Sequence, residues 1–74
     1  MIFNERLKML RQERKMTQMQ TAEALGLNYR HYQRLEADGS TPNFANLVQI
    51  ADLFGVSMDY MAGRTDNLEF KISG

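Results

Sequence analysis

The fold is decided by residues 18–35, which read QMQTAEALGLNYRHYQRL. Two short stretches with helical spacing of apolar residues flank Gly26-Leu27-Asn28. Glycine ends a helix without steric cost because it enters the left-handed backbone conformation, and asparagine favours the capping position of the next helix. The segment therefore predicts two short helices joined by a tight turn.

The two predicted helices have a small and apolar inner side. We expect their junction to be filled by Ala22, Leu25, Leu27, Tyr32 and Leu35. With these residues turned inward, the second helix exposes Tyr29, Arg30, Gln33 and Arg34. Such residues can contact base edges and phosphates, and arginine can bind guanine O6 and N7 through two parallel bonds. The pair is therefore predicted to be a helix-turn-helix that contacts duplex DNA.

The exposed residues also have an ordinary interpretation. Arg30 and Arg34 would then be solvated groups on a free helix face, and Tyr29 would pack on the preceding helix. The surrounding motif favours DNA contact for the two arginines and leaves both interpretations of Tyr29 open.

The rest of the chain predicts three further helices. Apolar residues recur at helical spacing over about 4–14 and 44–54, and Ser57 can cap a short helix over 57–62. The two central helices are expected over about 17–25 and 28–37, the first opened by the capping box Thr17-x-x-Gln20. The sequence therefore predicts an all-α domain of five helices over residues 1–66.

Residues 67–74 follow a different pattern. Leu68, Phe70 and Ile72 alternate with polar residues, which is the periodicity of a strand. A lone strand is not stable by itself. The tail is therefore expected either to be disordered or to pair with a partner, for example the same tail of a second subunit.

The charges are divided unevenly between the two halves of the chain. Residues 1–35 hold seven basic and three acidic residues, a net charge of +4, whereas residues 36–74 hold two basic and six acidic residues, a net charge of −4. Such a domain can present a basic face to phosphate although its total charge is zero. Ordinary solvated helix faces would explain the same distribution, so charge alone leaves the choice open.

Several function classes lack the residues that they need. The chain has no cysteine, and its single histidine, His31, has no metal-ligand spacing, so we expect no metal site and interpret His31 as solvated or close to a phosphate. No nucleophile stands beside a base and no glycine-rich phosphate loop precedes a helix. We expect no enzyme, no cofactor and no small-molecule ligand.

The chain of 74 residues is long enough for one small domain. It contains no apolar run approaching the roughly 18 residues that cross a bilayer, and its first residues lack the apolar stretch of a secretory signal. We therefore expect a soluble cytoplasmic protein without membrane contact.

An ordered set of short motifs carries a resemblance to a known family. The motifs are Arg6-Leu7-Lys8-x-Leu10-Arg11, Met16-Thr17-Gln18, Ala22-x-x-Leu25-Gly26, Leu35-Glu36, Gly55-Val56-Ser57-Met58-Asp59-Tyr60 and Gly63-Arg64-Thr65-Asp66-Asn67. From about residue 4 to 63, the chain resembles the lambda-repressor-like, XRE-type (Cro/C1-type) helix-turn-helix family of bacterial and phage regulators.

The resemblance implies roles for particular residues. Gln18 would contact a phosphate and brace the recognition helix, while Arg11 and Glu36 would form a partly buried ion pair. The residues facing bases in the major groove would be Tyr29, Arg30 and Arg34. Those near the DNA backbone would be Asn28 and Gln33, with Ser40, Thr41 and Asn43 in the following loop.

The chain departs from the family pattern at three places. Thr21 replaces a large aliphatic residue, which predicts a thinner core at that point, and Tyr32 replaces isoleucine or valine, which predicts a buried ring with its hydroxyl at the edge. Asp38 stands in a loop where basic residues are common, so the loop offers little positive charge.

The leading hypothesis is a transcriptional regulator, acting as a repressor, that binds an inverted-repeat operator as a homodimer. The dimer surface is expected on the fifth helix and the tail, where an apolar patch would include Tyr60, Met61, Phe70 and Ile72. The alternative is a protein-interaction module on the same scaffold, such as an antitoxin or anti-repressor, which zero net charge favours modestly.

Overall fold

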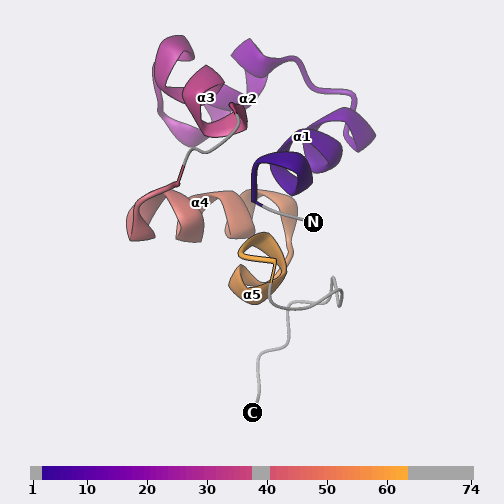
Figure 1. Ribbon diagram of the computed structural model, residues 1–74. Coiled ribbons are helices and arrows are strands. Elements are labelled where there is room, and N and C mark those ends of the chain that lie inside the picture. Colours follow the sequence, from indigo (N-terminus) through magenta and orange to yellow (C-terminus); the bar gives the residue numbers. More distant parts are fainter. Residues whose placement is uncertain (1–2, 38–40, 64–74) are drawn as a thin grey trace.

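The computed structural model describes residues 3–37 and 41–63, and all five elements in these ranges are helices (Figure 1). They are α1 (Phe3–Glu13), α2 (Gln18–Leu25), α3 (Tyr29–Glu36), α4 (Phe44–Phe54) and α5 (Met58–Met61). The five-helix all-α prediction is confirmed. The predicted domain boundary at 66/67 and the predicted tail strand lie outside the described residues.

Side-chain caps begin four of these helices. Thr17 and Gln20 form both bonds of the capping box at α2, and the side chains of Asn28, Asn43 and Ser57 accept from backbone N–H groups of α3, α4 and α5. At the turn between α2 and α3, Gly26 has a φ of 70°, a conformation that a side chain would strain.

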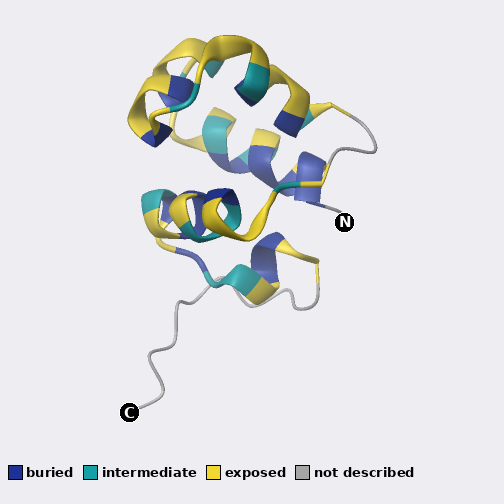
Figure 2. Ribbon diagram, turned by 90° about the vertical axis from the view of Figure 1, so that its left-hand side faces the viewer, coloured by how far each residue is buried: buried dark blue, intermediate teal, exposed yellow. Residues whose placement is uncertain are grey.

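The helices are arranged in two groups, which are connected by α1 and by direct packing of α2 on α4. In Figure 1, α2 and α3 lie together above α4 and α5, and α1 packs against α3 and α5. Figure 2 shows the buried positions turned toward the interior and the outer sides of α2 and α3 mostly exposed. The largest fully buried side chains come from all five helices: Leu7, Thr21, Tyr32, Ile50, Phe54 and Met61.

Two of the unusual core positions are explained by hydrogen bonds. Thr21 is fully buried and its hydroxyl donates to the Thr17 carbonyl oxygen over 2.9 Å, so the threonine has its polar atom satisfied inside the helix. Tyr32 is also fully buried, and its hydroxyl donates to the Glu36 carboxylate at the edge of the core.

The predicted apolar patch on the fifth helix is wrong for its two described members. Tyr60 is 6% exposed and Met61 is 0% exposed. Because α5 has only four residues, its part of the core is filled by two neighbouring apolar side chains, and these are Tyr60 and Met61. The other two members of the predicted patch, Phe70 and Ile72, lie outside the described residues.

Polar side chains of α1 and of the turn after it hold the ends of three other helices. Asn4 Nδ2 donates to the Leu35 carbonyl oxygen of α3 over 2.9 Å. Arg6 Nη1 donates to the Tyr60 carbonyl oxygen of α5, and Arg14 Nη2 donates to the Phe54 carbonyl oxygen, the last of α4, over 2.7 Å each. These donors supply side-chain partners to carbonyls near the C-terminal ends of helices, where intrahelical partners run out.

The described helices are all too short or too polar to cross a membrane.

Candidate nucleic-acid interface

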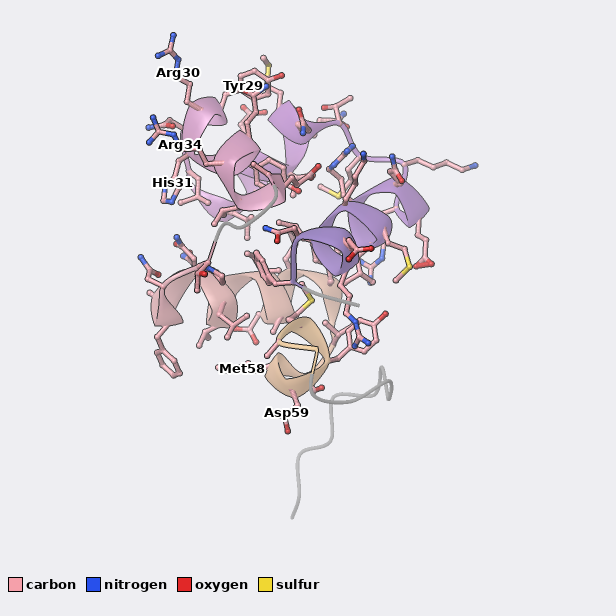
Figure 3. All side chains as sticks on the ribbon, in the orientation of Figure 1. Tyr29, Arg30, His31, Arg34, Met58 and Asp59 are labelled. Atoms are coloured by element: carbon pink, nitrogen blue, oxygen red, sulfur yellow. The ribbon has the colours of Figure 1, made fainter. Side chains whose placement is uncertain are left out.

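The outer face of α3 is formed by the residues that its buried side leaves free. Tyr32 and Leu35 are buried, whereas Arg30, Gln33 and Arg34 are exposed. In Figure 3, Tyr29, Arg30 and Arg34 point away from the body of the domain, with the two arginines on the same side of the helix. The helix therefore presents its polar face as a projecting surface.

The face contains an open hollow of about 560 Å³. It is lined by Asn28, Tyr29, Arg30, His31 and Arg34. None of these residues is acidic, and neither arginine forms an ion pair within the described part of the chain. The hollow thus offers hydrogen-bond donors and two free positive charges to a ligand that brings acceptors.

Behind this face, one carboxylate joins three helices. Glu36 Oε2 accepts from Arg11 Nε over 2.6 Å and from the Tyr32 hydroxyl. Glu36 Oε1 accepts from Arg11 Nη2 over 3.2 Å and from Gln18 Nε2 over 3.1 Å. We call Arg11, Gln18, Tyr32 and Glu36 the Glu36 cluster. It contains the ion pair that the family resemblance implied, and it ties α1 and the start of α2 to the end of α3.

The cluster shifts the pKa values of its members so that the charges persist. Burial alone would raise the pKa of Glu36, but the hydrogen bonds from Arg11, Tyr32 and Gln18 outweigh it and hold that pKa below its usual value. Burial, followed by the bond to Glu36, raises the pKa of the Tyr32 hydroxyl. Near neutral pH the cluster therefore contains a carboxylate, a guanidinium and a protonated tyrosine.

Gln18 is the first residue of α2 and is half-buried. Its Nε2 donates to Glu36, which links this side chain to α3. The amide keeps a second N–H and its carbonyl oxygen for other partners. The contact of Gln18 with a phosphate stays a prediction.

The loop before α4 is described from Thr41 onward. Thr41 and Asn43 are exposed, and Asn43 Oδ1 accepts from Asn46 N over 2.8 Å as the cap of α4. Ser40, also predicted to meet phosphates, and Asp38 lie outside the described residues. The contacts of this loop with DNA stay predictions.

His31 has a neighbour that sequence reasoning missed. The residue is half-buried, and its Nε2 lies 3.4 Å from Nδ2 of Asn46, a buried residue of α4. The signal in the sequence is Asn46, a polar residue on the inner side of an apolar helix. Its partner His31 lies 15 positions away in another helix, so no helical spacing relates the two. Within the described residues, no group of three histidine, cysteine, aspartate or glutamate side chains lies close enough together to hold a metal ion.

Comparison with known proteins places this fold in a class. A family model described as "Helix-turn-helix" matches residues 7–61. The chain therefore belongs to this helix-turn-helix family, which the ordered motifs indicated.

Relatives from bacteria and phage agree with the assignment. The chain is 37% identical over 71 residues to an uncharacterized HTH-type transcriptional regulator, YobD, of Bacillus subtilis (strain 168), covering 96% of this chain and 63% of that protein. It is 36% identical over 64 residues to the cryptic phage CTXphi transcriptional repressor RstR of Vibrio cholerae, covering 86% of this chain and 57% of the relative. The chain thus spans about three fifths of the length of these two relatives.

A solved structure has the same fold. The P22 c2 repressor, crystallised in complex with synthetic operator 9T in the presence of Tl⁺, matches with a TM-score of 0.79 at 22% identity. The match covers 88% of this chain and 98% of that one. The lambda-repressor-like fold predicted from the motifs is confirmed.

Proposed function

We propose that this domain binds double-stranded DNA sequence-specifically as a transcriptional regulator, with α3 in the major groove. The observation that carries the proposal is the outer face of α3, where Arg30 and Arg34 project without an ion-pair partner among the described residues. The proposal is supported by the names of relatives, among them a transcriptional repressor, and by the operator complex of the P22 c2 repressor.

The proposed docking gives each helix of the motif a separate task. In a helix-turn-helix, the second helix enters the major groove and the first crosses the backbone. Gln18 would contact a phosphate at the start of α2. The base-facing residues would be Tyr29, Arg30 and Arg34, and those near the backbone would be Asn28, Gln33, Ser40, Thr41 and Asn43.

Repression by a homodimer on an inverted repeat completes the proposal. A single domain of this size makes few base and phosphate contacts, so two linked copies on half-sites about 34 Å apart would supply most of the useful affinity. Tyr60 and Met61 are buried in the core and do not contribute to such an interface. The dimer would therefore use other surfaces.

Selection of bound sites from a random duplex library tests the proposal. We expect an enriched inverted repeat that is bound at least about a thousandfold more tightly than random DNA. Lys8→Ala serves as the control and should select the same repeat, because it removes one exposed positive charge on α1 and leaves α3 intact. A library without enrichment, bound only weakly and in a salt-sensitive way, would contradict DNA reading and favour the protein-interaction module.

A further inference from the structure

We infer that each half-site bound by this domain contains two guanines, one read by Arg30 and the other by Arg34, no more than about two base-pair steps apart. The inference rests on the proposed function and specifies what the α3 face recognises. It depends on the geometry of α3 and on the Glu36 cluster behind it.

The two arginines are free to bind a ligand. Both are exposed and line the same open hollow, and neither has an ion-pair partner in the described part of the chain. Figure 3 shows them projecting from the same side of α3. A surface arginine with a local carboxylate would lose part of its donor capacity to that partner, and here both guanidinium groups keep it.

The only acidic residue of α3 is held away from this face. Glu36 accepts from Arg11, Gln18 and Tyr32 with both of its oxygens, so it cannot turn outward to pair with Arg34. Among the described residues that line it, the hollow consequently contains no carboxylate that could accept from the amino group of cytosine. The cluster thus sets the chemical preference of the opposite face toward bases that present acceptors.

Guanine is the base whose major-groove edge fits a free guanidinium. Its O6 and N7 are both acceptors and take two parallel bonds from arginine, whereas adenine presents one acceptor and one donor. Arg30 and Arg34 are four positions apart, about 6 Å along the helix axis, and base pairs are spaced about 3.4 Å apart. Two neighbouring guanines, on the same or opposite strands, therefore lie within reach of the pair.

The test pairs protein variants with modified duplexes. The preferred site of the unmodified chain is selected first, and each guanine of a half-site is then replaced by 7-deazaguanine, which lacks the N7 acceptor. We expect an affinity loss of about tenfold at two positions. In Arg30→Ala one of the two losses should disappear and the other remain, and Arg34→Ala should show the reverse.

Control variants separate base reading from other effects. Gln33→Ala and Lys8→Ala should keep both guanine preferences, and all four variants should retain the melting temperature because each side chain is exposed. The inference is overturned if the selected half-site lacks the guanine pair, or if both arginine variants keep both 7-deazaguanine losses. An unenriched library would instead overturn the proposed function itself.

Discussion

The inner and outer sides of α3 use arginine in opposite ways. Beside its C-terminal end, Arg11 has a side chain that is 12% exposed and donates to Glu36 and to the Met16 carbonyl oxygen. On its outer face, Arg30 and Arg34 are exposed and have no ion-pair partner within residues 3–37 and 41–63. The same guanidinium group therefore joins helices where it is buried and paired, and is available to a ligand where it is free.

The largest loss of stability is expected when the buried arginine is removed. Arg11→Ala leaves the Glu36 carboxylate, whose side chain is 4% exposed, without its cation. We expect a loss of about 3–5 kcal/mol in the free energy of unfolding, measured by urea denaturation.

A double variant checks this explanation. Arg11→Met with Glu36→Leu removes both charges together and should recover most of the lost stability. A double variant as unstable as Arg11→Ala would contradict the explanation and assign the loss to the hydrogen bonds that the pair makes with the Met16 carbonyl, Gln18 and Tyr32.

Acid should weaken the same pair gradually. Because folding lowers the pKa of Glu36, its carboxylate contributes stability above the unfolded pKa of about 4.3, and this contribution is lost as the pH falls through the folded value. The stability difference between the unmodified chain and Glu36→Gln should therefore narrow from pH 6 to pH 3 in urea denaturation. A constant difference would show that the charge of Glu36 is not what stabilises the cluster.

Removing one neutral donor from the Glu36 cluster should lower the stability less than removing Arg11 does. Tyr32→Phe keeps the buried ring and deletes the hydroxyl that donates to Glu36. We expect the free energy of unfolding to fall by about 1.5–3 kcal/mol, since hydrogen bonds to charged groups fall in this range. Thermal unfolding followed by circular dichroism measures it. An unchanged melting temperature would mean that the Arg11 and Gln18 bonds alone hold the carboxylate.

The smallest effect is expected at Gln18, which lies between the Glu36 cluster and the proposed DNA-binding face. Gln18→Ala removes a bond to Glu36 and a proposed phosphate contact. Affinity for the selected site and for random duplex should fall by the same factor of about five, because a phosphate contact carries no sequence information. Fluorescence anisotropy with both duplexes measures this ratio. A larger loss on the selected site would instead assign Gln18 to base reading.

The fold was largely predictable because local rules decide it. The capping box at Thr17 and the left-handed Gly26 follow from neighbouring residues, and the helix ends agree with the predicted ones to within about two positions. The misassigned positions belong to α5, since a helix of four residues has too little periodicity to show which side faces the core.

The sequence predicts the outer face of the candidate site better than it predicts the Glu36 cluster behind that face. The outward positions of Arg30 and Arg34 follow from the helical spacing of Tyr32 and Leu35, whereas the Arg11–Glu36 pair came from the family resemblance. The sequence predicts the Tyr32 hydroxyl at the edge of the core, but not its bond to Glu36, which spans one helical turn.

The donors that α1 and its following turn supply to the other helices also bear on how the protein is made. Asn4, Arg14 and Arg6 donate to carbonyls that lie 31, 40 and 54 positions away along the chain. As the chain leaves the ribosome, the last of these acceptors, on Tyr60, emerges long after the donors. The ends of α4 and α5 can therefore be secured only late in synthesis, and the native domain is expected to open as one cooperative unit in hydrogen exchange.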